Sequence, residues 1–109
     1  MLARSLLFMR PLEGRRDELI DLFERLGVPE RALQQEGCLS VELQVAQEPS
    51  EPVLVTALWS HRDAYDGWLS NPWREQAGDQ LEALLTEPPE GTVYDIRLAA
   101  GTAIPEPRA

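Results

Sequence analysis

The hydrophobic pattern of this chain changes its period at Gly37, and this change constrains the fold more than any other feature. Over residues 14–26, apolar side chains recur with the 3.6-residue period of an amphipathic helix. From Leu39 to Val45, apolar and polar side chains alternate instead, which places the apolar ones on one face of a strand. Gly37 lies at the junction, where a helix end favours a residue that tolerates positive φ. The chain therefore combines helices and strands around one core.

Proline, glycine and asparagine divide the rest of the chain into short elements. We predict strands over residues 5–9, 39–45, 53–59 and 92–98. We predict helices over residues 14–26, 60–69 and 73–85, with one or two further helical turns over residues 30–36. The predicted breaks are Gly27-Val28-Pro29, the loop 47–52, Asn71-Pro72 and the turn 88–91.

Two local patterns support individual elements of this prediction. Ser60 followed by Asp63 resembles a capping box at the start of the second helix. From Thr92 to Leu98, the residues Tyr94, Ile96 and Leu98 alternate with Val93, Asp95 and Arg97, which predicts a last strand.

The order of the predicted elements is β-α-β-β-α-β, the split arrangement of a ferredoxin-like α+β unit with an antiparallel sheet. Helices cover one face of such a sheet, and in a chain of 109 residues the other face needs a partner. A second copy is the simplest partner, so we predict a homodimer whose two sheets close into a dimeric α/β barrel. The apolar space between the sheets would hold a ligand. We assign residues 1–98 to this domain and residues 99–109 to an extended C-terminal tail.

The charge balance restricts the partners. Nineteen acidic and ten basic residues give a formal net charge of −9, which repels phosphate backbones and anionic membrane surfaces. We therefore expect neither nucleic acid nor a membrane as a partner. The single cysteine, Cys38, excludes an internal disulfide, and the apolar patch between Arg4 and Arg10 is too short for a signal peptide. These features predict a cytoplasmic protein.

Aromatic residues are concentrated in one segment, with three tryptophans and a tyrosine within the fifteen residues from Trp59 to Trp73. Trp68 and Trp73 flank the helix break at Asn71, and large aromatic side chains beside a break often wall a pocket. Packing in the core or at a dimer interface is the alternative for each of them. Asn71 is both a candidate for substrate binding and a natural cap for the helix that starts at Pro72.

Other kinds of site find little support in the sequence. His61 and Cys38 are the only histidine and the only cysteine, and their separation does not predict a metal site. The chain has no glycine-rich phosphate loop, no nucleophile elbow and no nicotinamide fingerprint. We expect no metal and no cofactor.

Two motifs give the chain a family resemblance. The first is the run Glu36-Gly37-Cys38-Leu39-Ser40-Val41-Glu42-Leu43, and the second is Leu58-Trp59-Ser60 followed by Asp63-Ala64-Tyr65. Both resemble signatures of antibiotic-biosynthesis monooxygenase domains, over roughly residues 4–98. The resemblance implies a dimeric α/β barrel. It also implies an activity to be expected of the chain: some members of this family oxidise phenolic or quinol intermediates of aromatic polyketides to quinones with molecular oxygen, without metal or flavin.

The resemblance implies roles for individual residues as well. Trp59 and Tyr65 match positions that line the cavity of the quinone-forming relatives, and they are our candidates for catalysis. Our candidates for binding an aromatic substrate are Trp68, Trp73, Asn71 and Arg74.

The chain departs from these relatives at two positions. Val55 stands where they carry an asparagine on the strand before the tryptophan. Asp79 stands near their later helix arginine, and Arg74 is only a nearby substitute. Half of the pattern is therefore present.

A second branch of the family degrades haem. Its helix tryptophan corresponds to Trp68, but its haem-ligating histidine falls at Gly78. The asparagine that this branch carries on its first strand is absent between Arg4 and Arg10. His61, at the start of a helix, does not replace the histidine, so the sequence disfavours haem degradation.

Two hypotheses from different classes follow. The first is a cofactor-independent monooxygenase, or a cyclase or isomerase of the same fold, that acts on a flat aromatic molecule in secondary metabolism. It predicts a closed apolar cavity with Trp59, Tyr65 and Trp68 directed into it. The second is a non-catalytic barrel that binds a small ligand or assists a larger biosynthetic enzyme. It predicts that these aromatic side chains fill the interior and leave no enclosed space.

Overall fold

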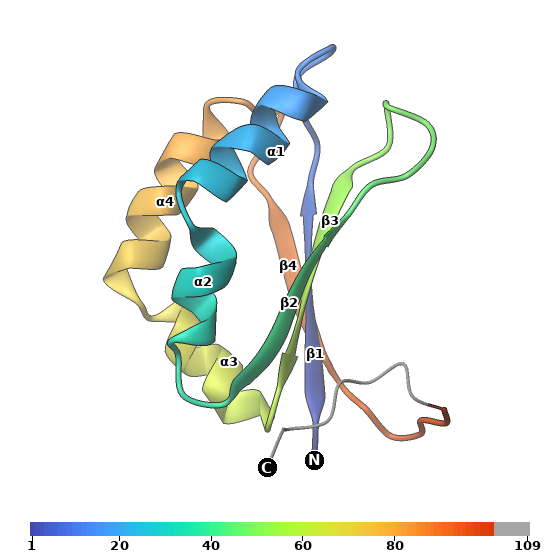
Figure 1. The fold of residues 1–109 in the computed structure, drawn as a ribbon, viewed down its shortest axis with the longest axis vertical. Coiled ribbons are helices and arrows are strands. Elements are labelled where there is room, and N and C mark those ends of the chain that lie inside the picture. Colours follow the sequence, from blue (N-terminus) through green and yellow to red (C-terminus); the bar gives the residue numbers. More distant parts are fainter. Residues whose placement is uncertain (102–109) are drawn as a thin grey trace.

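The computed structural model describes residues 1–101, which form a four-stranded antiparallel sheet with helices on one face (Figure 1). The strands are β1 (Ala3–Met9), β2 (Cys38–Gln44), β3 (Val53–Trp59) and β4 (Glu90–Asp95), in the order β2-β3-β1-β4 across the sheet. The helices are α1 (Arg16–Arg25), α2 (Val28–Leu33), α3 (Arg62–Leu69) and α4 (Pro72–Glu82). The predicted ferredoxin-like α+β class is confirmed. Most of the predicted tail, residues 102–109, lies outside the described residues.

Local sequence breaks the helical layer at two points. Gly27 separates α1 from α2 with a φ of 71°, a left-handed conformation that glycine adopts without strain. Asn71 separates α3 from α4, and its side-chain oxygen accepts the backbone N–H of Trp73 at 2.9 Å. The cap predicted at Asn71 is thus confirmed. Pro72 occupies the first turn of α4, where its missing N–H costs nothing.

The strand registers assign each side chain to one face of the sheet. Ser5 of β1 pairs with Ala57 of β3 and with Val93 of β4, so these three side chains share the face that the helices cover. The same face carries Val41, which pairs with Ala57 from the other side. No described helix covers the opposite face (Figure 1). Among the described helices, none is long and apolar enough to cross a membrane.

Two groups of buried side chains fill the space between helices and sheet. We call the first the Leu19 cluster; its members are Met9, Leu19, Phe23, Val53, Val55, Leu81, Leu84 and Leu85. We call the second the Trp59 cluster; its members are Ala3, Ala32, Ala57, Trp59, Ala64, Tyr65 and Trp68. The Leu19 cluster is mainly aliphatic, whereas the Trp59 cluster combines large aromatic rings with alanines.

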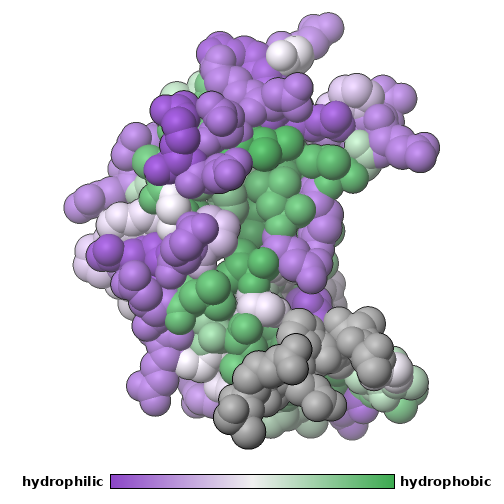
Figure 2. Space-filling view, viewed as in Figure 1, coloured by the Kyte–Doolittle hydropathy of each residue, from purple (hydrophilic) through white to green (hydrophobic). Residues whose placement is uncertain are grey.

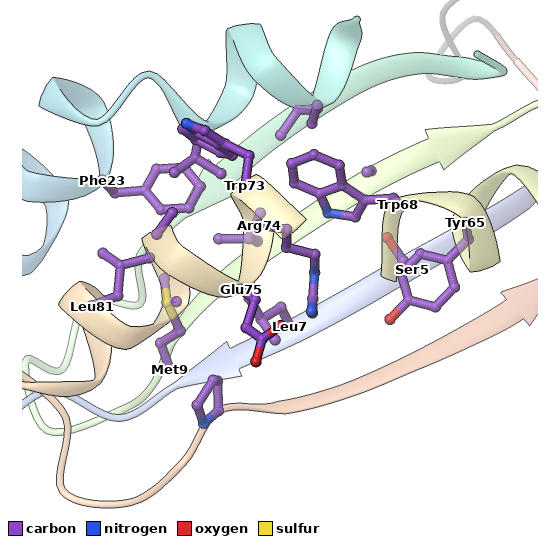
Figure 3. A pocket seen from close by; sticks show the side chains of 18 of the residues that line it. Ser5, Leu7, Met9, Phe23, Tyr65, Trp68, Trp73, Arg74, Glu75 and Leu81 are labelled. Carbon is purple, nitrogen blue, oxygen red and sulfur yellow. The ribbon is translucent and has the colours of Figure 1, made fainter. Parts of the chain in front are cut away.

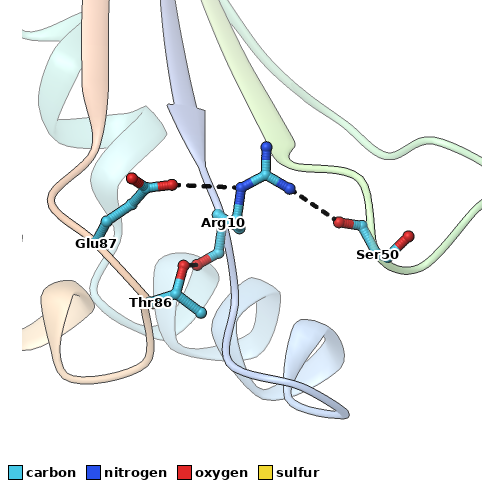
Figure 4. A network of polar contacts seen from close by, with 4 residues as sticks. All are labelled: Arg10, Ser50, Thr86 and Glu87. Atoms are coloured by element: carbon cyan, nitrogen blue, oxygen red, sulfur yellow. Dashed lines mark hydrogen bonds and ion pairs between the residues drawn. The ribbon is translucent and has the colours of Figure 1, made fainter.

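The loops at the Leu19 end are joined through Arg10, directly after β1 (Figure 4). Its guanidinium donates to the backbone oxygen of Ser50 at 3.2 Å and lies 3.4 Å from the Glu87 carboxylate. The Arg10 carbonyl accepts the backbone N–H of Thr86 at 3.0 Å. Arg10 and Glu87 are exposed, so their ion pair adds little stability. The backbone bond holds the segment that leads into β4 against the end of β1.

The last strand begins and ends earlier than residues 92–98, and neither Tyr94 nor Leu98 is buried. Tyr94 pairs with Arg4 on the face away from the helices and is 61% exposed, and Leu98 lies beyond the strand and is 92% exposed. Val93 packs instead against the Trp59 cluster. The reason is the register with β1, which an edge strand takes from its neighbour whatever its own apolar pattern. Gly91 also belongs to β4, although the sequence indicated a turn there.

The capping box expected at Ser60 is also wrong. His61 occupies the cap position of α3, and no side chain caps this helix. The Ser60 backbone N–H donates to the Gly37 carbonyl at 2.8 Å. A Cβ on Gly37 would lie 2.8 Å from the Ser60 hydroxyl and 2.5 Å from the Ala64 Cβ. This contact holds Ser60 against the junction before β2, which explains why Gly37 has no side chain.

Candidate functional site

A pocket of about 220 Å³ lies between the helices and the sheet of the single chain. Figure 2 shows hydrophobic side chains gathered in the hollow beside the helical layer. Small side chains, among them Ser5, Ala57, Ala77 and Gly78, line the pocket and leave this space open. The sequence prediction had placed a ligand between the sheets of two copies. The pocket of the single chain lies on the helix-covered side of its sheet, and the space between two sheets stays a prediction.

The pocket has an apolar end and an end with polar groups. Met9, Phe23 and Leu81 lie at the first end, and Ser5 and Tyr65 lie at the second (Figure 3). A flat molecule placed in the pocket would therefore have aliphatic contacts at one end and hydrogen-bonding groups at the other.

Trp59, at the end of β3, forms part of the pocket wall and is fully buried. Its indole N–H donates to the Ser5 hydroxyl oxygen at 2.9 Å. Its ring centroid lies 5.7 Å from that of Tyr65, and the two planes are tilted by 58°, a favourable arrangement for an aromatic pair. Because the Trp59 N–H already has an acceptor, the indole presents its ring to a ligand, not a free hydrogen-bond donor.

Tyr65 projects from α3 and carries its hydroxyl toward β4. A Cβ on Gly91 would lie 3.4 Å from that hydroxyl oxygen, so glycine gives the phenol its space. Burial raises the pKa of Tyr65 above its usual value; the Arg74 guanidinium opposes this shift, and the Asp66 carboxylate adds to it. Tyr65 is thus a neutral phenol at physiological pH and can donate a hydrogen bond.

Trp68 and Trp73 form a second wall of the pocket, on either side of the break between α3 and α4. Their ring centroids are 6.3 Å apart with an interplanar angle of 39°. The Arg31 guanidinium of α2 lies 5.1 Å from the centroid of the Trp73 ring, within reach of a cation–π interaction. Asn71 is not among the residues that line the pocket; its observed role is to cap α4 and so to fix Trp73.

Charged groups of α4 border the same space. Arg74 extends between Glu75 and Tyr65 across the middle of the pocket (Figure 3). Asp79 and Glu82 also line it from α4, and both are exposed. Arg74 is therefore a cation bordered by several carboxylates, so any anionic group that enters must approach Arg74 closely to be favoured.

Val55 and Gly78, two positions at which the sequence departs from relatives, both line the pocket. Val55 is buried in the Leu19 cluster and offers no hydrogen bond. Gly78 would have no neighbour within 4 Å of an added Cβ, so space remains beside this position. The departures thus change the pocket wall itself.

Sequence reasoning missed two residues of this site. Ser5 was read only as the first residue of a strand, although a polar residue at the start of an apolar run was a signal. Gly91 was assigned to a turn. Both acquire their positions beside Trp59 and Tyr65 only through the pairing of β1 with distant strands.

His61 and Cys38 take no part in the pocket lining. His61 is exposed, and Cys38 packs partly buried against the Trp59 cluster. Burial raises the pKa of the Cys38 thiol to about 11, partly offset by its contact with the Ser40 backbone, so the thiol is protonated and unreactive at neutral pH. Within residues 1–101, no three His, Cys, Asp or Glu side chains are grouped so as to hold a metal ion.

Several solved structures share this fold. The protein Rv0793 from Mycobacterium tuberculosis superposes with a TM-score of 0.75 at 20% identity, covering 93% of this chain and 100% of its own. A conserved protein from Methanosarcina mazei Go1 gives 0.73 at 18% identity, covering 86% and 91%. SnoaB, a cofactor-independent oxygenase from Streptomyces nogalater, gives 0.70 at 21% identity, covering 96% and 97%. At these identities the likeness establishes the fold.

The sequence itself provides the stronger comparison. No curated protein matches it. The family model described as antibiotic biosynthesis monooxygenase matches residues 4–86, which is most of the chain and includes both motifs identified above. This chain belongs to the antibiotic biosynthesis monooxygenase family.

Proposed function

We propose that this protein is a cofactor-independent monooxygenase that oxidises a small, flat, electron-rich aromatic molecule of the phenol or quinol type. The observation that carries the proposal is the convergence of Trp59, Tyr65 and Trp68 on one pocket that still has open space. Family membership and the likeness to SnoaB, a cofactor-independent oxygenase, support it. The volume of about 220 Å³ is below the ~300–1,000 Å³ of drug-sized pockets, which favours a compact substrate.

The proposed chemistry uses the substrate as the source of electrons. An aromatic methylene compound such as an anthrone loses a proton, and its carbanion or phenolate form reduces molecular oxygen. The methylene becomes a carbonyl, one oxygen atom enters the product, and the other leaves as water with the two hydrogens removed. The protein must desolvate the ring, favour its ionised form and hold it in place.

The pocket residues suit these three tasks. The rings of Trp59 and Trp68 can stack on a flat substrate and exclude water. Tyr65, neutral because burial raises its pKa, can donate to a negatively charged substrate oxygen. The Arg74 cation beside it favours the ionised substrate, and Trp73 closes the wall.

A second candidate is a non-catalytic ligand-binding or accessory protein, or a cyclase or isomerase of the same fold. The observation that favours it is the presence of Val55 in the pocket wall. The oxygenases that the chain resembles carry a hydrogen-bonding asparagine at this position. Such a protein would bind the same flat ligands and would consume no oxygen.

We further propose a cytoplasmic homodimer. The sheet face opposite the helices carries Phe8, which is 38% exposed, and Tyr94, which is 61% exposed. Light scattering coupled to size-exclusion chromatography tests the dimer: a mass of twice 12.3 kDa supports it, and a monomer at micromolar concentration contradicts it.

The activity is tested by oxygen uptake of the metal-free protein with a panel of hydroquinones and anthrones. We expect uptake to fall at least tenfold in Tyr65→Phe, because that variant keeps the ring and loses the donor. Trp59→Phe combined with Tyr65→Phe should abolish it. Tyr94→Phe is the matched control, since this exposed tyrosine lies on the other face of the sheet and should leave uptake unchanged. Ligand binding without uptake by the native protein would favour the second candidate.

A further inference from the structure

Ser5 has an unusual position for a serine. It lies in the middle of the sheet on β1, paired with both β3 and β4, and it is only 8% exposed. It lines the pocket beside Trp59 and Tyr65 (Figure 3). Burying a hydroxyl in an apolar layer is unfavourable unless its hydrogen bonds are made.

The hydrogen bonds of Ser5 are only half accounted for within the described residues. A serine hydroxyl has one proton to donate and two lone pairs that accept, whereas the indole N–H of a tryptophan can only donate. In the 2.9 Å contact, Trp59 is therefore the donor and Ser5 the acceptor. No described residue accepts a hydrogen bond from the Ser5 hydroxyl, so its proton is available to the pocket.

We propose that Ser5 is a specificity-determining residue, whose hydroxyl donates a hydrogen bond to an oxygen atom of the bound aromatic ligand. The inference rests on the proposed function in placing such a ligand in the pocket. Trp59 supports Ser5 in this role because accepting the indole N–H makes the hydroxyl a stronger donor. It also fixes the position of the Ser5 oxygen relative to the pocket wall.

This assignment narrows the substrate class. The end of the ligand that reaches Ser5 must carry an acceptor, such as a ketone oxygen, a quinone oxygen or a phenolate. Tyr65 lies beside it as a second neutral donor, so the same oxygen can accept from both. A pure hydrocarbon ring would leave the Ser5 proton without a partner and would bind less tightly.

Two matched probes test the proposal, the aromatic ketone α-tetralone and tetralin, which has the same rings and no oxygen. Calorimetric titration should give the ketone about threefold to tenfold tighter binding, the usual net effect of one neutral hydrogen bond. Ser5→Ala should reduce this preference to nearly one.

Ser5→Ala also leaves the buried Trp59 N–H without an acceptor, so a second pair of variants separates the two effects. Trp59→Phe removes that N–H and keeps the Ser5 hydroxyl, and it should retain a preference for the ketone. Trp59→Phe combined with Ser5→Ala should lose it. A purely structural serine would give the same ratio of affinities in both variants.

The outcomes distinguish this inference from the proposed function. Equal binding of both probes to the native protein, or a preference that survives Ser5→Ala in the Trp59→Phe background, overturns the role of Ser5 and leaves the pocket as an aromatic site. A Ser5-dependent preference without oxygen uptake supports Ser5 and overturns the oxygenase. Binding of neither probe overturns the role of Ser5, whereas the oxygenase is decided by oxygen uptake with the hydroquinones and anthrones.

Discussion

The Leu19 cluster and the Trp59 cluster lie between the same helices and the same sheet, yet they are built differently. Leu19, Met9 and Val53 are completely buried, and the other members of their cluster are branched aliphatic side chains and one phenylalanine, Phe23. In the Trp59 cluster, a fully buried indole is hydrogen-bonded to a serine, and the large rings are accompanied by small alanines.

The difference indicates that the two clusters have different roles: the first mainly stabilises the fold, and the second mainly shapes the pocket. Aliphatic side chains interdigitate closely and stabilise the fold, whereas large rigid rings placed beside alanine and glycine leave space of defined shape. Two groups with a raised pKa, Tyr65 and Cys38, belong to or pack against the Trp59 cluster. Met9, Phe23, Val55 and Leu81 of the Leu19 cluster also line the pocket, but Leu19 and Val53 do not. We therefore expect substitutions of these two residues to affect stability and substitutions in the Trp59 cluster to affect binding.

The largest expected effect on stability is that of Leu19→Ala. Truncation of a fully buried leucine should lower the free energy of unfolding by about 2–5 kcal/mol, through lost burial and the cavity left behind. Urea denaturation followed by circular dichroism measures it. The affinity of the folded variant for α-tetralone should stay within about twofold of the native value; a loss of binding as large as that of Ser5→Ala would contradict this difference in roles.

Asn71→Ala should have an intermediate effect. It removes the side-chain acceptor of the Trp73 N–H, and the loss of such a cap typically costs about 1 kcal/mol. The same denaturation curves measure it. Because Asn71 does not line the pocket, we expect binding to weaken only through Trp73. Asn71→Ser, which keeps a capping oxygen, is the control and should restore both properties.

Ala57→Val should change stability by less than about 1 kcal/mol, because the added methyl groups enter open space and valine suits a strand. The same methyl groups occupy part of the pocket floor, so ligand binding should fall at least tenfold. Titration of both probes measures the loss. Val53→Ile, at the Leu19 end of the same strand, is the control that should leave binding unchanged.

The smallest expected effect at neutral pH is that of Cys38, whose ionisation makes stability depend on pH only in the alkaline range. Its pKa is raised from 9.0 to about 11 in the folded protein, so the folded state favours the protonated thiol. The resulting stabilisation is fully present below pH 9 and is lost as the pH rises toward 11. Native Cys38 and Cys38→Ala should therefore converge in stability over this interval in chemical denaturation. A gain for the native protein above pH 9 would have the wrong sign.

Sequence patterns were sufficient for the order and type of the elements, because period two, period 3.6 and the breakers Gly27, Asn71 and Pro72 are local signals. They were insufficient where the position of a side chain depends on contacts between segments that are distant in the sequence. Tyr94 faces outward because β1 sets the register of β4, and Ser60 contacts Gly37 instead of capping α3.

Some residues of the candidate site could likewise be predicted from the sequence, and others could not. Trp59, Tyr65, Trp68, Trp73 and Arg74 could be named from the sequence as a group, and all five line the pocket. The partner of Trp59 could not, because Ser5 lies 54 residues away in the chain and becomes its neighbour only when β1 pairs with β3. Small residues that create space leave no sequence signal of their own.

The central position of β1 has a consequence for how the molecule assembles. β1 is complete as a strand only when both β3 and β4 have joined it, and β4 follows β1 by more than eighty residues. Pairing across so long a loop is entropically costly and slow to form, so we expect the docking of β4 to be a late event in folding. Since β4 brings Gly91 beneath the Tyr65 hydroxyl, partly folded chains lack an intact binding surface. The ligand therefore binds only to chains in which β4 has docked.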